Sequence, residues 1–286
     1  MSKLSRSLLI GSSLAFLASC NTKYKVWVGP DQSQKIYNLS YGMHSRQKMD
    51  LFLPAEYPET TPTIVMVHGG AWKYGNKRSL IHVQKFLFKN GFPTVNINYR
   101  LVSKKKGITY KDQLNDIGLA IEKMNDLTGK AKLQKNNYII LGESAGAHLS
   151  LLYGYKNPDQ IKKIISLSGP TDFFSPTFTN SFYSKYSLPT IEKVVGLKYN
   201  RKDIPNEFVE ASPIANISNV PTLLFQGNRD FLVNKHQGFM LDSALTSQNI
   251  EHKLIVMDKS GHIPRQFSKT KRDSIIYPAI LDWIKK

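Results

Sequence analysis

The chain has 286 residues, enough for one large domain, and it contains neither an internal repeat nor a low-complexity segment. Its single cysteine excludes an intrachain disulfide. The formal net charge is +18, but apart from residues 104–106 the basic residues are scattered lysines and no nucleic-acid-binding module is visible, so nucleic acid is not an expected partner. The charge suits anionic polysaccharide or anionic lipid headgroups, although a lysine-rich proteome explains it more simply.

The first residues have the features of an export signal. Lys3 and Arg6 precede an apolar stretch at 8–17, which is too short for a membrane-spanning helix of about 20 apolar residues. The segment ends in Leu17-Ala18-Ser19-Cys20, which resembles the bacterial lipobox. That resemblance implies removal of residues 1–19 as a lipoprotein signal peptide and attachment of lipid to Cys20. A plain secretory peptide with an incidental cysteine is the alternative.

Lipid on Cys20 would anchor the protein to a membrane, because each buried CH₂ contributes about 0.8 kcal/mol. Position 21 is Asn rather than Asp, which by the enterobacterial sorting pattern indicates the outer membrane. Residues 20–35 are then expected to form the lipidated N-terminus and a tether, and 36–286 the folded domain. We therefore expect a lipid-anchored protein of the bacterial cell envelope.

From residue 63 onward, short apolar runs alternate with amphipathic segments. Strands are expected at 63–67, 138–141, 164–167, 221–226 and 252–257, and helices at 79–90, 112–127, 144–156, 236–247 and 274–286. Within 112–127, Leu114, Ile117 and Ile121 recur at helical spacing and predict one buried face. The alternation predicts an α/β fold with a mostly parallel central sheet and helices on both of its faces.

The run at 63–67 ends in His68-Gly69-Gly70-Ala71-Trp72. Acyl transfer needs backbone N–H donors aimed at an oxyanion, and a Gly-Gly pair after a strand lets the backbone approach that oxygen closely. We expect the N–H groups of Gly70, Ala71 and Ala145 to form an oxyanion hole. A glycine turn with a packed Trp is the structural alternative.

The segment Gly142-Glu143-Ser144-Ala145-Gly146 lies between a predicted strand and a predicted helix, which is the context of a nucleophile elbow. Glycine is required there because larger side chains would collide with the neighbouring strand and helix. The pentapeptide alone matches roughly one chain in ten by chance, and an ordinary glycine-rich turn is the alternative. The pattern predicts Ser144 as a nucleophile.

A serine nucleophile needs a base, and the base needs an orienting carboxylate. His262 lies in a polar turn after the strand at 252–257, and Asp230 follows the preceding strand, which gives the order serine, aspartate, histidine. Asp172, one strand earlier, is the runner-up for the acid. The other six histidines are expected to be structural or surface residues: His68 in the oxyanion loop, His148 on the helix after Ser144, His252 at a strand start, and His44, His82 and His236 without supporting context.

Residues 173–219 interrupt the alternation between two strands. The segment carries many aromatic residues: Phe173, Phe174, Phe178, Phe182, Tyr183, Tyr186, Tyr199 and Phe208. We expect a cap or lid insertion whose aromatic side chains stack on a substrate ring, or a small satellite core that only packs, or both.

Four motifs give the chain its resemblance to a known superfamily: residues 68–72, 98–101 (Asn-Tyr-Arg-Leu), 142–148 and 168–172 (Ser-Gly-Pro-Thr-Asp). From about Tyr37 to the C-terminus it is similar to α/β hydrolases, most of all to the esterase and lipase branch with a His-Gly-Gly-x-Trp motif and its feruloyl-esterase-like bacterial carboxylesterases. Residues 47–54 look like the second strand of that group. Many lipases have Gly where this chain has Ala71. The resemblance implies an α/β-hydrolase fold with a small cap.

We therefore expect a serine carboxylesterase without metal or organic cofactor. Its expected substrates are small-molecule or carbohydrate-linked esters with short acyl groups, such as acetyl or feruloyl esters, cleaved through an acyl-enzyme. The motifs also resemble those of arylformamidases and isoprenylcysteine methylesterases, so an amide hydrolase on the same triad is an open alternative. A non-catalytic binding protein that kept the fold is another. The oligomeric state is not indicated.

Overall fold

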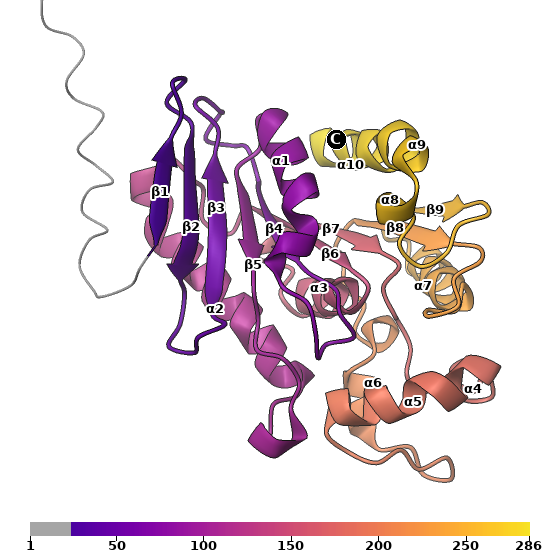
Figure 1. Ribbon diagram of the computed structural model, residues 1–286. Helices are drawn as coiled ribbons and strands as arrows, with labels where there is room; N and C mark the ends of the chain where they lie inside the picture. Colours follow the sequence, from indigo (N-terminus) through magenta and orange to yellow (C-terminus); the bar gives the residue numbers. More distant parts are fainter. Residues whose placement is uncertain (1–23) are drawn as a thin grey trace, which may run out of the picture.

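The computed structural model describes residues 24–286, so the expected signal peptide and Cys20 lie outside the described residues. Within this part of the chain one sheet runs in the order β1-β2-β3-β5-β4-β6-β7-β8-β9 (Figure 1). The strands are β1 (Lys25–Val28), β2 (Gln34–Ser40), β3 (Lys48–Leu53), β4 (Thr63–Val67), β5 (Thr94–Ile97), β6 (Tyr138–Glu143), β7 (Ile161–Leu167), β8 (Thr222–Gly227) and β9 (His252–Met257).

The sheet is mostly parallel, as predicted. Strands β1, β2 and β3 pair antiparallel, and β3 pairs antiparallel with β5. Every pair from β5 to β9 is parallel. The carboxyl ends of these six strands therefore meet at one edge of the sheet, and the loops that follow them are brought together there.

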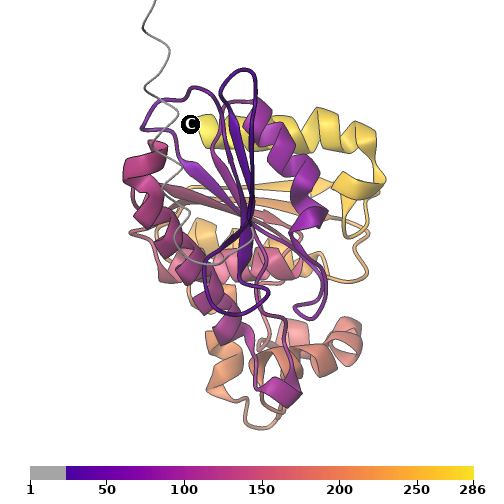
Figure 2. The same ribbon diagram turned by 60° about the vertical axis from the view of Figure 1, so that its left-hand side comes forward.

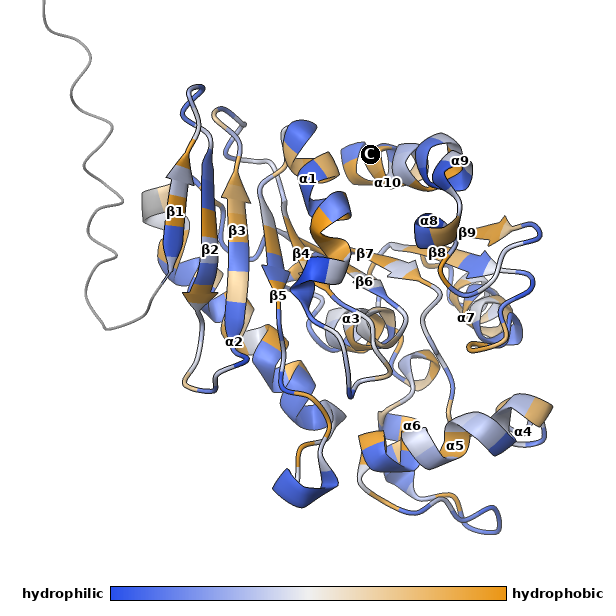
Figure 3. Cartoon of the chain, viewed as in Figure 1, coloured by the Kyte–Doolittle hydropathy of each residue, from blue (hydrophilic) through white to orange (hydrophobic). Residues whose placement is uncertain are grey.

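Helices cover both faces of the sheet, which confirms the predicted α/β architecture (Figure 2). On one face lie α2 (Tyr110–Ala131), α3 (Ala145–Lys156) and α7 (His236–Ser247), and on the other α1 (Ile81–Lys89) and α10 (Tyr277–Lys285). Successive side chains of a strand point to opposite faces, so Val65 of β4 belongs to the first core and Met66 to the second. This two-sided burial explains the continuous apolar runs, seen as orange stretches on the arrows of Figure 3.

The predicted helices are all present, with small shifts at their ends. Helix α2 begins two residues before the expected start, because Thr109 and Asp112 form a capping box that satisfies its first N–H groups. A short 3₁₀ turn at Lys77–Leu80 precedes α1, and a π-helical turn at Arg272–Ile276 precedes α10. Helix ends are set by such local hydrogen bonds, which apolar periodicity does not report.

The N-terminal boundary differs from the expectation. Residues 25–28 lie in the range expected as a tether, yet they form β1 and pair with β2 from Lys25↔Tyr37 to Val28↔Gln34. The sheet thus begins before residue 36. All four residues of β1 are exposed, because it is an edge strand without a covering helix, and this left no apolar alternation for the sequence to reveal.

Residues 173–219 contribute three α-helices, α4 (Pro176–Thr179), α5 (Phe182–Val195) and α6 (Asn206–Glu210), beyond the carboxyl edge of the sheet (Figure 1). The side chains of Ser175 and Ser181 cap α4 and α5. We call residues 173–219 the cap. After β9 come the short helices α8 (Pro264–Phe267) and α9 (Lys269–Lys271). Among residues 24–286, none of the helices has the length and apolar character needed to cross a membrane.

Candidate active site

Ser144 lies in a strained turn between β6 and α3. Its backbone has φ 56° and ψ −122°, a conformation that L residues seldom adopt. The flanking glycines make the turn possible: a Cβ on Gly142 would lie 2.2 Å from the carbonyl oxygen of Gly146, and a Cβ on Gly146 would lie 2.1 Å from that of Val67. The turn is therefore a nucleophile elbow in geometry as well as in sequence.

The three residues predicted from the sequence as a triad lie in contact. Ser144 Oγ is 2.7 Å from His262 Nε2, and His262 Nδ1 is 2.7 Å from Asp230 Oδ2. Asp230 is buried, and its other carboxylate oxygen accepts the backbone N–H groups of Leu232 and Val233, both at 2.9 Å. These bonds hold the carboxylate in place, and the carboxylate in turn fixes the ring of His262 with a proton on Nδ1 and a free Nε2 facing the serine.

Asp172, the runner-up acid, does not reach His262. One of its carboxylate oxygens accepts the backbone N–H groups of Phe174 and Ser175, both at 2.9 Å, and the other accepts the hydroxyl of Ser175. The residue is buried and lines the cavity, but its hydrogen-bonding capacity is used to start the cap. Geometry thus separates two acids that sequence position alone could only rank.

The predicted oxyanion loop follows β4 and bends back on itself. Gly70, Ala71 and Trp72 have φ of 124°, 48° and 61° in turn. Glycine is required at position 70, since a Cβ there would lie 2.3 Å from the carbonyl oxygen of Tyr74. Within the part of the chain that the structure describes, the N–H groups of Gly70, Ala71 and Ala145 have no protein acceptor. Gly70 and Ala71 line the same cavity as Ser144.

His68 supports this loop through buried contacts. It is fully buried and its ring stacks on Tyr99 at 4.2 Å, while the Tyr99 hydroxyl donates to the His68 carbonyl oxygen at 2.7 Å. Burial lowers the pKa of His68 to about 4, so the ring is neutral at pH 7. It donates through Nδ1 to the carbonyl of Gly69 at 2.7 Å and accepts a proton of Arg46 on Nε2 at 3.3 Å. The expectation of a bracing role agrees with these contacts.

His148 joins the loop to the cap. Trp72 Nε1 donates to His148 Nδ1 at 3.1 Å, and His148 Nε2 donates to the carbonyl of Ala211, just after α6, at 2.7 Å. Burial lowers the pKa of His148 to about 4, so its ring is also neutral at pH 7 and each nitrogen keeps one role. Its position on α3 was expected to be a packing position, and the structure places it in a buried polar contact as well.

Sequence reasoning missed the buried ion pair beside the nucleophile. Arg265, on α8, makes a bidentate contact with Glu143 of the elbow, with nitrogen–oxygen distances of 2.7–2.9 Å and both side chains only 4% exposed. The pair ties the last residue of β6, next to Ser144, to helix α8, which begins two residues after His262. The partners are 122 positions apart, so no local pattern joins them. The available signal was an acidic residue, Glu143, inside the predicted elbow and a basic residue, Arg265, three positions after the predicted histidine.

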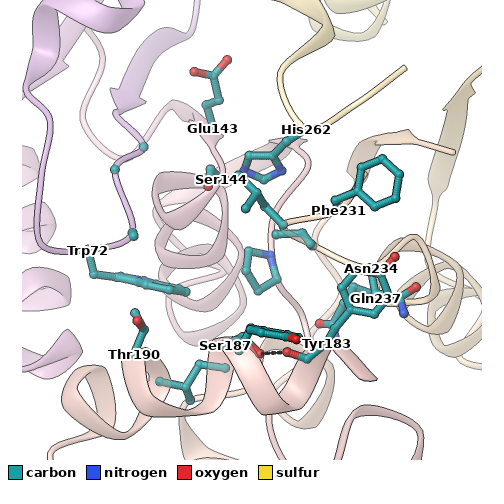
Figure 4. A pocket seen from close by; sticks show the side chains of 18 of the residues that line it. Trp72, Glu143, Ser144, Tyr183, Ser187, Thr190, Phe231, Asn234, Gln237 and His262 are labelled. Atoms are coloured by element: carbon teal, nitrogen blue, oxygen red, sulfur yellow. Dashed lines mark hydrogen bonds between the residues drawn. The ribbon is translucent and has the colours of Figure 1, made fainter. Parts of the chain in front are cut away.

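The triad opens into a cavity of about 990 Å³ between the sheet edge and the cap. Figure 4 shows Ser144 and His262 above it, Trp72 on one side, Phe231 on the other, and Tyr183, Ser187 and Thr190 of α5 below. Some aromatic residues of the cap face the cavity and others pack in the interior of the cap, and the sequence allowed for both arrangements. Phe173, Phe178, Phe182, Tyr183 and Tyr186 line the cavity, whereas Tyr199 and Phe208 pack edge to face away from it at 4.9 Å.

This arrangement can carry out nucleophilic attack on a carbonyl carbon. The base is within hydrogen-bond distance of the hydroxyl that it must deprotonate. Three N–H groups without protein acceptors are available near the nucleophile for a developing oxyanion. Among residues 24–286 no cluster of three or more His, Cys, Asp or Glu side chains is placed to hold a metal ion.

Comparison with known proteins gives one family match and several relatives. The BD-FAE family model matches residues 49–245. The probable carboxylic ester hydrolase LipM of Mycobacterium tuberculosis is 27% identical over 234 residues, which cover 73% of this chain and 53% of that protein. The isoprenylcysteine alpha-carbonyl methylesterase ICME of Arabidopsis thaliana is 22% identical over 244 residues, covering 79% of this chain and 56% of that one. The chain thus spans about half the length of these curated relatives.

Solved structures share the fold. A truncated carbohydrate esterase from gut microbiota superposes with a TM-score of 0.72 at 19% identity, over 91% of this chain and 99% of that one. A bifunctional GH43-CE protein of Bacteroides eggerthii gives 0.73 at 20% identity, over 90% of this chain and 35% of that one. Esterase B of Lactobacillus rhamnosis gives 0.72 at 16% identity, over 91% and 88%.

Proposed function

Because the chain belongs to the BD-FAE family, whose fold is that of α/β hydrolases, we propose that it is a serine carboxylesterase acting through Ser144, His262 and Asp230. The observation that carries this proposal is the pair of 2.7 Å contacts that join the serine, histidine and aspartate side chains. The relatives named as carboxylic ester hydrolase and methylesterase support ester cleavage as the reaction.

The reaction follows from these contacts. Ser144 Oγ attacks the ester carbonyl while His262 Nε2 accepts its proton, and Asp230 stabilises the imidazolium that forms. The N–H groups of Gly70, Ala71 and Ala145 hold the oxyanion of the tetrahedral intermediate. Collapse of that intermediate releases the alcohol, which takes the proton from His262, and leaves an acyl-enzyme. Water deprotonated by His262 then releases the acid and restores the serine.

We propose short-chain esters as the substrate class, with acetyl or feruloyl esters of carbohydrates foremost. Support for the carbohydrate part comes from the structural neighbour named as a carbohydrate esterase from gut microbiota. The aromatic side chains of the cap offer a stacking surface for a sugar or phenolic ring.

The test is hydrolysis of p-nitrophenyl esters from acetate to decanoate by the protein and by its Ser144→Ala variant. Turnover that peaks at acetate or butyrate and disappears in the variant supports the esterase. An aryl formamide and a peptide amide, assayed in parallel, separate it from an amide hydrolase. A folded protein that neither turns over any of these nor reacts with a fluorophosphonate probe contradicts the proposal and indicates a binding role.

We also propose that lipid on Cys20 anchors the protein in the outer membrane of a bacterial envelope. Support comes from the sequence Leu17-Ala18-Ser19-Cys20 and from Asn21 after it. Mass spectrometry of the N-terminal peptide from membrane fractions tests this. The expected mass is that of an acylated chain beginning at Cys20, and Cys20→Ala should release the protein from membranes. An unmodified chain that retains residues 1–19 contradicts the proposal.

A further inference from the structure

The mouth of the cavity is ringed by exposed apolar side chains. Among the residues that the structure describes, thirteen large apolar side chains are exposed, and five of these line this one cavity. We define the rim as these five together with Phe267, which follows the lining residue Gln266: Tyr74, Phe182, Tyr186, Phe231, Leu232 and Phe267. Single exposed apolar residues are ordinary, but their concentration around one opening marks a surface that binds something apolar.

The rim is well exposed and comes from separate elements. Phe231 and Leu232, after β8, line the cavity and are still 77% and 71% exposed, so most of each side chain is accessible to solvent. Phe182 and Tyr186 lie one turn apart on α5 with ring centroids 5.1 Å apart. Tyr74 comes from the oxyanion loop. Because these elements surround the cavity, a flat apolar layer that covered the rim would also cover the entrance to Ser144.

Each of the four chain segments that contribute to the rim also carries an exposed lysine or arginine. The four segments are 73–78, 182–186, 229–235 and 265–269, and their exposed basic residues are Arg78, Lys185, Arg229, Lys235 and Lys269. The only carboxylate in these segments is Asp230, which is buried beneath His262. Aromatic and leucine side chains beside lysine and arginine are the composition of surfaces that enter the headgroup region of anionic membranes. A soluble polyanion would satisfy the bases but would leave the apolar side chains in water.

We propose that the rim docks on an anionic lipid bilayer, with the mouth of the cavity open to the lipid surface. The rim side chains enter the headgroup region and the bases contact lipid phosphates. An ester presented at that surface then reaches Ser144 without crossing bulk water. The docking itself does not depend on the esterase proposal.

The position of β1 agrees with this orientation. Strand β1 is antiparallel to β2, β2 to β3 and β3 to β5, so the chain enters β1 from the side of the sheet where the carboxyl ends carry the site, and Lys25 pairs with Tyr37, midway along β2. Lys25 follows Cys20 by five positions, which extended chain spans in at most about 18 Å. Lipid on Cys20 would therefore be attached on the side of the sheet that also carries the rim.

The test uses the full chain with Ser144→Ala and Cys20→Ala, so that neither turnover nor attached lipid contributes. Partition onto vesicles of phosphatidylcholine is compared with partition onto equal parts of phosphatidylcholine and phosphatidylglycerol. Stronger binding to the anionic vesicles is expected. Leu232→Ser should weaken it about tenfold, while Ile275→Ser, which alters an exposed apolar side chain between α9 and α10, should not.

The charges have a matched control of their own. Lys185→Gln together with Lys235→Gln should weaken anionic binding about 25-fold, at about fivefold for each base. Lys85→Gln together with Lys89→Gln removes the same charge from α1 and should leave binding unchanged. A fluorophore on Phe231→Cys should shift to the blue on anionic vesicles, and one on Ile275→Cys should not.

Three results would overturn the proposal. The first is equal binding to both vesicle types. The second is an equal loss in the rim and control variants. The third is displacement by soluble polygalacturonate together with indifference to Leu232→Ser, which would assign the bases to a polysaccharide. Every protein in the test lacks Ser144, so these results say nothing about ester hydrolysis, which the p-nitrophenyl ester assay tests separately.

Discussion

The two sides of the cavity are built in different ways. On the sheet side, close backbone contacts and buried polar pairs hold Ser144 and His262, and glycines at positions 142 and 146 admit no side chain. On the cap side, aromatic side chains stand on α5, a helix with Pro189 inside it, and Phe182 is 71% exposed. An interior proline removes one helical hydrogen bond, so α5 depends more on packing than an uninterrupted helix of the same length would.

The difference separates the reaction from the choice of substrate. Positions on the sheet side are held by buried partners and by glycines that admit no side chain, so changes there should abolish turnover or weaken the fold. The exposed positions on the cap side, such as Phe182 and Tyr186, make fewer contacts, so changes there should alter how tightly an ester binds. Four substitutions test this division, in descending order of expected effect.

The largest effect is expected from the acid of the triad. Asp230→Asn keeps the shape of the side chain but loses the charge that fixes the histidine tautomer, and kcat should fall about 10⁴-fold. Asp172→Asn is the matched control, because the carboxylate of Asp172 bonds only to the turn that starts the cap. Steady-state kinetics on p-nitrophenyl butyrate measures both. A larger loss of kcat in Asp172→Asn would return the role to the runner-up.

The second effect tests the ion pair between the two site loops. Arg265→Leu leaves the carboxylate of Glu143 buried without a countercharge, with only the side-chain amide of Gln266 donating to it, which should lower the free energy of unfolding by about 3–5 kcal/mol. Adding Glu143→Gln should restore part of that loss, because no charge then remains buried. Arg272→Leu is the control, since its pair with Asp273 is exposed and should contribute little. Urea denaturation measures the free energy of unfolding of all three variants. Equal losses for Arg265→Leu and Arg272→Leu would contradict a stabilising role for the buried pair of Glu143 and Arg265.

What the sequence predicted, and what it did not, follows the same division. Strand, glycine and turn patterns are local, so residues 142–146 and the loops after β8 and β9 were sufficient to nominate Ser144, Asp230 and His262, which the structure brings together. The pair Glu143–Arg265 depends on tertiary contact over 122 positions and has no local signature. The cavity-facing members of the cap could not be named, because periodicity does not say which side of a short helix meets a substrate.

The third effect concerns His148, which joins the two sides. In the folded protein burial lowers its pKa to about 4 from an ordinary 6.5, so between these values only the unfolded chain binds the proton. Stability should therefore fall as pH drops through this window, by about 2 kcal/mol between pH 7.5 and pH 5 for this residue. His148→Gln keeps a hydrogen-bond donor and an acceptor but does not titrate, so it should remove this residue's part of the pH dependence of stability. Urea denaturation at both pH values measures it, and an unchanged pH dependence in the variant would assign the acid sensitivity elsewhere, for example to His68, whose pKa is lowered in the same direction.

The smallest effect is expected on the cap side. Tyr183 lines the cavity from α5 (Figure 4). Tyr183→Ala removes apolar surface that we expect an ester to contact equally in the ground and transition states. KM should rise about fivefold for esters that reach the ring, while kcat stays near its original value, because uniform binding is lost and the triad is untouched. Leu197→Ala, in the cap but outside the cavity, should change neither constant. A fall in kcat with constant KM would mean that α5 positions the reacting groups, and the division between the two sides of the cavity would fail at that residue.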